Sequence, residues 1–176
     1  MTVATSTPGQ APGGADQRGR LAGITALLLA VLLVLLVVLS ITVVQLSRQR
    51  SAQKERAQVA AVGREVAVAF TTLDYRSLTQ DFGNLARLTT PSFRQAYLTQ
   101  TNQAAELIVK AHGRSTGTVA QLAVANLQGS TASVIVAIND RVVNDQVPKG
   151  QTKDFRLTIS LQKSGSGWLA SHVQQV

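Results

Sequence analysis

The sequence predicts an α+β protein with a single transmembrane helix, in which about three helices pack on a four-stranded antiparallel sheet. Three observations lead to this prediction. A long uncharged apolar run occupies residues 21–44, helical periodicity continues to about residue 112, and β-branched or alternating runs fill the remainder. The 176 residues have room for one ordinary domain besides the apolar run.

The apolar run reads LAGITALLLAVLLVLLVVLSITVV, and its only polar members are Thr25, Ser40 and Thr42. At about 1.5 Å per residue, a helix of this length extends roughly 36 Å, which exceeds a hydrocarbon core of about 30 Å. A cleavable signal peptide would have a shorter apolar region followed by a small-residue cleavage site. We therefore predict an uncleaved transmembrane anchor over residues 21–46.

The anchor divides the chain into a short tail and a larger domain. Residues 1–20 are rich in Gly, Pro, Ala, Ser and Thr, so we predict a disordered N-terminal tail. Residues 47–176 are predicted to form the α+β domain. The chain has no cysteine, so it forms neither a disulfide nor a thiolate metal site, and this leaves the compartment open.

The chain is basic, with 17 Lys and Arg against 9 Asp and Glu and a formal net charge of +8. Beside a membrane, a basic surface favours the lipid bilayer or an acidic protein partner. The lack of clustered aromatic residues argues against nucleic acid. The C-terminal flank of the span, QLSRQRSAQKER, carries more basic residues than the N-terminal flank, so the positive-inside rule would place the domain in the cytoplasm. Because these residues could serve the domain itself, the orientation stays open.

Three helices are predicted after the span. The first covers residues 47–73, where apolar residues recur at helical spacing: Val59, Val62, Val66, Phe70 and Leu73. Asp74 is expected to cap a second, short helix over YRSLTQDFGNLA. The third is expected to begin at Pro91 behind the N-cap Thr90 and to close with Gly113 as the residue after its C-cap. Its predicted apolar face contains Phe93, Ala96, Tyr97, Ala104, Leu107, Ile108 and Ala111.

Four strands are predicted in the C-terminal part, over the runs TVAQLAVANL, ASVIVAIND, DFRLTISLQ and WLASHVQQV. In the third run, the apolar residues Phe155, Leu157, Ile159 and Leu161 alternate with polar ones. One face is thus buried and the other is not, as in an antiparallel sheet covered by helices on one side. Trp168 is expected in the core or at the sheet edge.

The stretch FTTLDYRSLTQDFGNLARLTTPSFRQAY, with the anchor before it and SGWLASHV near the end, resembles the actinobacterial Mce-associated membrane proteins. The resemblance covers residues 21–176. Residues in that family's T-x-D-Y…D…L-T-x-x-F…Y pattern are Leu73, Asp74, Tyr75, Asp81, Leu88, Thr89, Phe93 and Tyr97. The resemblance implies an NTF2-like, cone-shaped domain on the outer side of the plasma membrane. It further implies a non-enzymatic accessory subunit that stabilises an Mce-type lipid or sterol importer, with the protein subunits of that complex, or a homo-oligomer, as partners.

Two other functions remain open. A VirB8-like scaffold of a secretion or conjugation machine has the same layout of anchor, helices and sheet. A domain that binds or isomerises a small apolar ligand would place a carboxylate and a tyrosine inside the cone. The candidates for such chemistry are Asp74, Tyr75, Asp81, Tyr97, His112 and His172.

We predict no catalytic, cofactor-binding or metal-binding residue, and no cofactor. Neither histidine is accompanied by a second ligand at metal spacing. Asp74 is interpreted as a helix cap and Tyr75 as a half-buried ring with a polar tip. The residues predicted to have structural or family-motif roles are Asp74, Tyr75, Asp81, Phe93, Tyr97 and Trp168.

Overall fold

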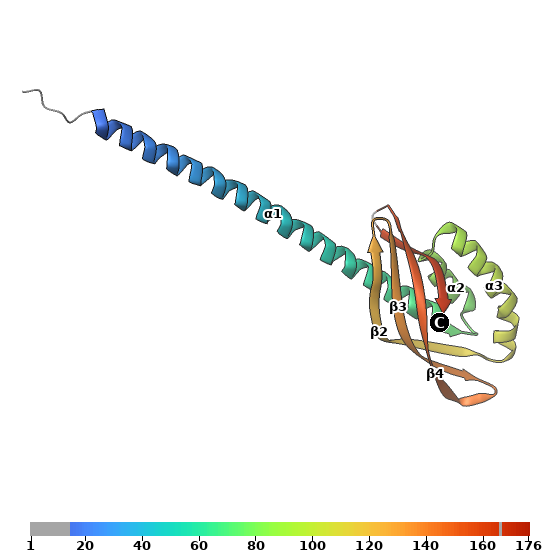
Figure 1. Cartoon of the computed structure of the whole chain (residues 1–176). Helices are drawn as coiled ribbons and strands as arrows, with labels where there is room; N and C mark the ends of the chain where they lie inside the picture. Colours follow the sequence, from blue (N-terminus) through green and yellow to red (C-terminus); the bar gives the residue numbers. More distant parts are fainter. Residues whose placement is uncertain (1–14, 166) are drawn as a thin grey trace, which may run out of the picture. The chain divides into compact units, whose positions relative to one another are not determined.

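The computed structural model describes the backbone of residues 15–165 and 167–176, and the side chains of residues 33, 35–36, 38–165 and 167–176. The chain forms two compact units, Met1–Arg50 and Ser51–Val176. The elements of the described part are α1 (Ala15–Thr71), β1 (Leu73–Asp74), α2 (Leu78–Arg87), α3 (Pro91–Lys110), β2 (Arg114–Gln128), β3 (Thr131–Asn144), β4 (Val147–Ser164) and β5 (Gly167–Gln175) (Figure 1).

The first unit contains the N-terminal part of α1. Most of the predicted tail, residues 1–20, lies outside the described residues, and α1 begins within it at Ala15. The predicted span, residues 21–46, lies inside α1, but most of its side chains are not described. Along the residues that are described, no helix has the length and apolar character needed to cross a membrane. The anchor therefore stays a prediction of the sequence.

The second unit contains an antiparallel sheet with the strand order β1-β2-β3-β4-β5, so each strand pairs with its neighbours in the sequence. The tight turns after β2 and β4 each contain a glycine with positive φ, Gly129 at 55° and Gly165 at 59°. The prediction of four strands was wrong by one. The additional strand, β1, has only two residues, Leu73 opposite Ser115 and Asp74 opposite Arg114, which is too short for a detectable alternation.

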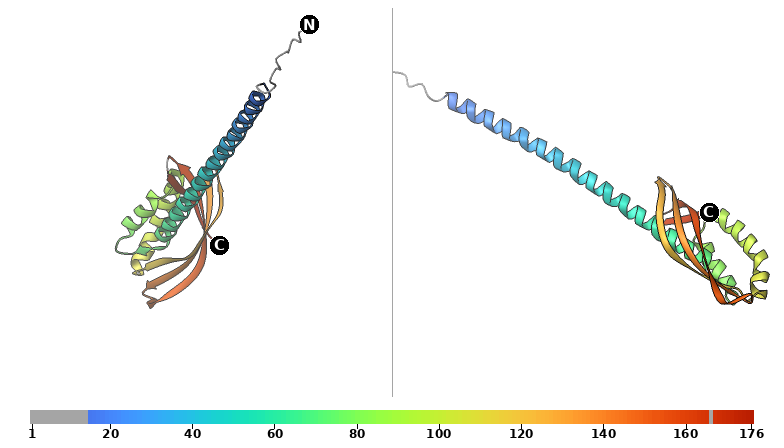
Figure 2. Two further views of the ribbon diagram at one scale, coloured as in Figure 1. Left: turned by 90° about the vertical axis from the view of Figure 1, so that its left-hand side faces the viewer. Right: turned by 60° about the horizontal axis from the view of Figure 1, so that its bottom comes forward.

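The helices cover one face of this sheet (Figure 2), as the alternating pattern predicted. The residues of β3 and β4 that point toward the helices are 0 to 1% exposed: Val134, Val136, Ile138, Leu157, Ile159 and Leu161. Phe155 continues this row and is half-buried. The residues between them point to the open face, where Ile135 is 40% exposed. The core therefore lies between the helices and this single face of the sheet.

The last turns of α1 pack closely on the sheet, and Val59, Val66 and Ala67 are completely buried. A Cβ on Gly63 would lie 3.0 Å from a Val134 methyl, and one on Gly117 would lie 1.8 Å from the Thr71 hydroxyl. Glycine at these two positions is what allows the backbones to approach. The predicted apolar face of this helix is confirmed, but the helix ends at Thr71, two residues earlier than expected.

The helices α2 and α3 follow after a short corner. The expected start of α3 is confirmed, with Thr90 as N-cap and Pro91 at the first position, although the Thr90 side chain makes no capping hydrogen bond. Its expected apolar face was wrong in part, since Ala96, Ala104 and Leu107 are exposed. The predictions of Phe93, Tyr97 and Ile108 as buried or partly buried are confirmed, and the same face also contains Leu98 and Ala105.

The end of α3 differs from the prediction by one residue. His112, not Gly113, has the positive φ, at 48°. The N–H of Gly113 donates to the Ile108 carbonyl at 2.9 Å, and the N–H of His112 donates to the Val109 carbonyl at 3.1 Å. This pair of bonds is the Schellman arrangement, in which the left-handed residue comes directly after the C-cap.

Candidate functional site

The corner between α1 and α2 contains three of the predicted motif residues, and Asp74 does not cap a helix there. Asp74 lies in β1, and α2 begins only at Leu78, with Ser77 as its N-cap. The Asp74 carboxylate accepts the backbone N–H of Arg76 at 3.0 Å and pairs with the Arg76 guanidinium at 2.7 Å. These bonds to Arg76 lower the pKa of Asp74 to about 2. The prediction of Asp74 as a helix cap was therefore wrong, because the chain first makes a turn and a strand pair.

Asp81 connects the two sides of the corner instead. Its Oδ2 accepts the backbone N–H of Asp74 at 2.9 Å and the hydroxyl of Ser77 at 3.1 Å. One carboxylate in the first turns of α2 thus holds both β1 and the residue before the helix. The sequence singled out Asp81 as part of the family pattern and as a candidate for ligand chemistry, without this role.

Tyr75 links the corner to the end of α3. Its N–H donates to the Gly113 carbonyl at 3.0 Å, and its ring meets the His112 ring edge-on, with centroids 5.2 Å apart. The Nδ1 of His112 lies 3.0 Å from an Asp145 carboxylate oxygen in the turn between β3 and β4. Both partners of this pair are largely exposed. Tyr75 therefore has the packing role that the sequence predicted, at a junction of three segments.

Tyr97 occupies the centre of an aromatic cluster, which we define as Phe70, Phe82, Phe93 and Tyr97. The other three rings have centroids 6.1 to 6.4 Å from the Tyr97 ring. Tyr97 is 7% exposed, and its burial raises the pKa of its hydroxyl to about 12. The cluster packs between α1, α2 and α3, since Phe70, Phe82 and Phe93 come from these three helices.

The remaining candidates lie in different parts of the domain, and of these only His172 contacts the cluster within the described residues. Asp74 and Tyr75 lie at the corner, and His112 contacts Asp145. His172, on β5, lies beside the Phe93 ring at 6.2 Å between centroids. Trp168 is 4% exposed in the sheet, as predicted, with the Lys163 ammonium over its ring. Within the described residues, no three His, Asp or Glu side chains gather as a metal site would require.

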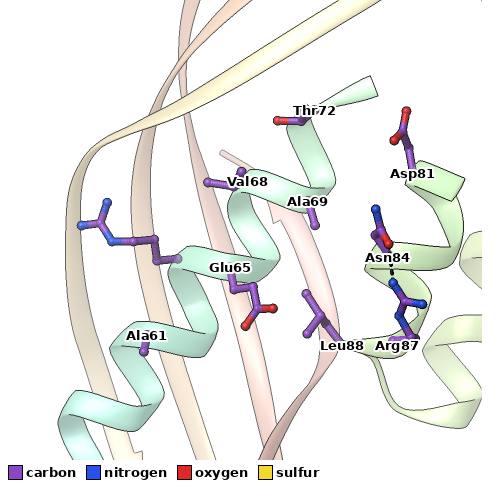
Figure 3. A pocket seen from close by; sticks show the side chains of 10 residues that line it. Ala61, Glu65, Val68, Ala69, Thr72, Asp81, Asn84, Arg87 and Leu88 are labelled. Carbon is purple, nitrogen blue, oxygen red and sulfur yellow. Dashed lines mark hydrogen bonds between the residues drawn. The ribbon is translucent and has the colours of Figure 1, made fainter. Parts of the chain in front are cut away.

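An open groove of about 630 Å³ runs between α1 and α2 (Figure 3). Its lining combines small apolar side chains with charged and polar ones: Ala61, Arg64, Glu65, Val68, Ala69, Thr72, Asp81, Asn84, Arg87 and Leu88. In Figure 3, Leu88 points across the groove toward Glu65, and Asn84 accepts a hydrogen bond from Arg87. We call this the α1/α2 groove.

The α1/α2 groove has the composition of a protein contact surface. Val68 is 38% exposed although it is a large apolar residue, and the same lining contains two arginines and two carboxylates. Protein interfaces likewise combine apolar with polar and charged side chains. The hydroxyl of Thr72 also lines the groove and, in the described part of the chain, is a buried side-chain group without a hydrogen-bond partner.

Sequence reasoning did not identify this groove. Its residues come from two helices whose relative placement depends on the corner at Asp81. Val68 was the one local signal, because it lies off the apolar face formed by Val62, Val66 and Phe70. A single apolar residue outside such a face is common on protein surfaces and does not by itself indicate a site.

The fold is shared with solved domains of bacterial secretion proteins. An IcmL-like type IV secretion system protein from Legionella pneumophila superposes with a TM-score of 0.60 and 19% identity, over 69% of this chain and 91% of that one. CagV, a VirB8 homolog from Helicobacter pylori, superposes with a TM-score of 0.55 and 12% identity, over 68% of this chain and 97% of that one. VirB8 from Agrobacterium tumefaciens superposes with a TM-score of 0.52 and 13% identity, over 70% of this chain and 92% of that one. At these identities the likeness concerns the fold alone.

The chain belongs to the family described as "Uncharacterized protein Rv1363c/MT1408-like", whose pattern matches residues 21–176. Rv1363c from Mycobacterium tuberculosis is 24% identical over 124 residues. That alignment covers 70% of this chain and 48% of the relative, so this chain matches about half of the relative's length.

Proposed function

We propose that this protein is a non-enzymatic assembly subunit of a multi-subunit complex in the cell envelope, held at the membrane by one helix. The observation that carries this proposal is the VirB8-like fold of the domain. The solved relatives with this fold include proteins described as components of type IV secretion systems. The sequence identities to these relatives are too low to infer that this chain binds the same partners. The proposal therefore takes from them only the type of role, assembly of a complex.

The interior of the domain supports a binding role more than a catalytic one. The aromatic cluster packs between the three helices, and burial raises the pKa of its tyrosine, Tyr97, to about 12. A general acid or base works best with a pKa near the operating pH. The surface, in contrast, offers the α1/α2 groove, in which partner side chains can reach Val68.

The membrane anchor belongs to this proposal. The described apolar side chains of the predicted span are turned to the outside of the helix, with Leu33 64%, Leu39 60% and Val43 59% exposed. Contiguous exposed apolar surface of this kind favours a lipid environment. We place the domain on the extracytoplasmic side, since two relatives of the same fold are described as periplasmic, a fragment of TraM and a domain of DotI.

A more specific form of the proposal concerns the partner. The resemblance of the motif from Leu73 to Tyr97 to the Mce-associated proteins suggests an accessory subunit of an Mce-type lipid or sterol importer. The solved structures with this fold favour the other assembly role, a VirB8-like scaffold of a secretion or conjugation machine, more strongly. Both are assembly roles, and they differ in the proteins that the subunit holds together.

The test is purification of the tagged full-length protein from its own membranes in mild detergent, with the co-purifying proteins identified. We expect stoichiometric envelope proteins, either Mce-type permeases or secretion subunits, and we expect Val68→Asp to reduce their recovery. Val109→Asp is the matched control, because Val109 is 48% exposed on α3 outside the groove. Recovery of the protein without partners would contradict the proposal. Equal losses of partner proteins from the two variants would contradict a role of the α1/α2 groove in partner binding. A C-terminal alkaline phosphatase fusion tests the orientation: an active fusion supports an extracytoplasmic domain.

A further inference from the structure

The two edges of the sheet differ in how they are covered. At the β5 edge, the loop between α2 and α3 pairs with the strand. The N–H of Ala170 donates to the Leu88 carbonyl, and the N–H of Thr90 donates to the Ala170 carbonyl, each at 2.8 Å. At the other edge, β1 pairs only with Arg114 and Ser115 of β2. Residues 116–128 of β2 therefore have no strand on their outer side in the described structure (Figure 1).

The side chains of β2 show that the core is incomplete at this edge. Four of its apolar residues point toward the helices and are only partly buried: Val119, Leu122, Val124 and Leu127. The β3 residues paired with them are 0 to 5% exposed. The difference arises because β3 and β4 each have a strand on both sides, whereas β2 has one on a single side over most of its length. One additional strand would complete the burial of this row.

Apart from two bulges, the open edge lacks the features that usually protect such strands. Natural edges commonly carry lysine, other charges or proline. Residues 115–139 contain none of Asp, Glu, Lys, Arg or Pro. Two bulges interrupt β2, at Ala120 and Ala125, which have no partner residue on β3. These bulges adjust the twist of the edge but leave its backbone groups available.

The direction of α1 argues against a second copy of this chain as the occupant. Glu55 pairs with Lys163 near one end of the sheet, and the Thr71 carbonyl accepts the Ser115 hydroxyl at the other end. In this unit α1 therefore runs opposite to β2. A two-fold antiparallel pairing of β2 with its own copy would make the two Ser51 ends leave on opposite sides. The two predicted anchors would then begin on opposite sides of the dimer, although both must enter the same membrane.

We propose that β2 receives an extended segment of a different protein, which adds as a strand along residues 116–128. This inference rests on the proposed function, because it names how an envelope partner would be held. The chemistry of the segment follows from the edge. Alternate residues would be apolar to cover the partly buried row of β2, and the net charge of +8 favours acidic residues at the other positions. About every second residue of β2 offers its N–H and C=O to such a strand.

Site-specific photo-crosslinking in the full-length protein, in its own membranes, tests this directly. A benzoylphenylalanine at Ala123, exposed on β2, is compared with one at Gln162, exposed on β4 between two other strands. We expect a discrete adduct with another protein from position 123 and none from position 162. The absence of an adduct at 123 would overturn the proposal. So would an adduct of twice the mass of this chain, since the occupant would then be a second copy.

A proline pair tests whether the backbone of β2 makes the contact. Ala125→Pro adds a proline at a bulge of β2, and Ser171→Pro adds one at the bulge of β5, whose edge is already covered. We expect Ala125→Pro to lower the adduct yield by about tenfold, and Ser171→Pro to leave it unchanged. Thermal unfolding identifies any variant that fails to fold, and Ala125→Lys then replaces a failing Ala125→Pro, with the same expected loss. Unchanged yield in a folded Ala125 variant would overturn the proposal. If partners still co-purify with that variant, the assembly function stands and only this edge is excluded.

Discussion

The helices α1 and α3 differ in how closely they approach the sheet. The last turns of α1 are buried along a whole face, and Gly63 and Gly117 let its backbone come near to the strands. On α3, twenty residues long, only Tyr97 is fully buried. Several completely buried residues therefore make the α1 contact, whereas the α3 contact depends on Tyr97 and on partly buried neighbours. We infer that many residues share the stabilisation at the α1 contact, whereas at the α3 contact it depends mainly on Tyr97.

The largest expected effect on stability is at the α3 contact. Tyr97→Ala removes the ring at the centre of the aromatic cluster, so we expect a loss of about 3 to 5 kcal/mol in the free energy of unfolding. Urea unfolding followed by circular dichroism measures it. Phe93→Ala serves as the comparison, since Phe93 is only partly buried and a smaller loss is expected. Equal losses for the two variants would contradict the central role of Tyr97.

The next effect concerns the close approach of α1. Gly117→Ala would place a Cβ 1.8 Å from the Thr71 hydroxyl, so we expect a loss of about 3 kcal/mol. The matched control is Gly83→Ala on α2, where nothing lies within 4 Å and alanine favours the helix by up to about 1 kcal/mol. Equal free energies of unfolding for the Gly117→Ala and Gly83→Ala variants would contradict the close contact between α1 and β2.

The ionisation of Tyr97 predicts an alkaline limit to stability. Its pKa is raised from 10.0 to about 12 in the folded protein, so above pH 10 the unfolded chain releases this proton first. Stability should therefore fall as the pH rises from 10 to 12, by an amount on the order of 2 kcal/mol. Tyr97→Phe keeps the ring and lacks the proton, so its stability should fall less over this range. Identical pH profiles for the two proteins would show that the hydroxyl is not buried.

The corner offers a smaller effect that distinguishes two carboxylates. Asp81→Ala removes two hydrogen bonds, one from the Asp74 N–H and one from the Ser77 hydroxyl, and should cost about 1 to 2 kcal/mol. Asp74→Ala should cost less, because its pair with Arg76 lies at the surface. Thermal unfolding of both variants provides the comparison. A larger loss for Asp74→Ala would restore the original interpretation of Asp74 as the cap.

The smallest effect is expected at the outer face of α3. Leu107 is 70% exposed, so Leu107→Gln should change the free energy of unfolding by no more than about 0.5 kcal/mol. A loss above about 1 kcal/mol would mean that this face is packed, and the contrast between α1 and α3 would then weaken.

Sequence reasoning succeeded where a pattern is repeated along one element. The apolar face of α1 from Val59 to Phe70 and the alternation of Leu157, Ile159 and Leu161 were both identified, because each repeat has the period of its own helix or strand. It failed for α3, whose apolar residues fit more than one face, so that Leu107 was predicted inside and is outside. Which face turns inward depends on the position of Tyr97 against the other rings.

The candidate site was less predictable than the fold. Asp74, Tyr75 and Asp81 were selected from the family resemblance, and the three do lie together at the corner. Their roles were not predictable, because a carboxylate before a helix suits either a cap or a turn. The α1/α2 groove had no sequence signal beyond Val68, since its two walls lie on separate helices.

The sequence by itself determined the α+β class, the helical face of α1, the start of α3 at Pro91 and the buried face of the sheet. Each of these depends on residue spacing within a single segment, where local geometry dictates which side chains share a side. Only the tertiary structure decided that Asp81 holds the corner, that the aromatic cluster fills the interior, and that β2 keeps an open edge. These features depend on how separate segments approach one another, and that approach is set by packing between residues distant in the chain.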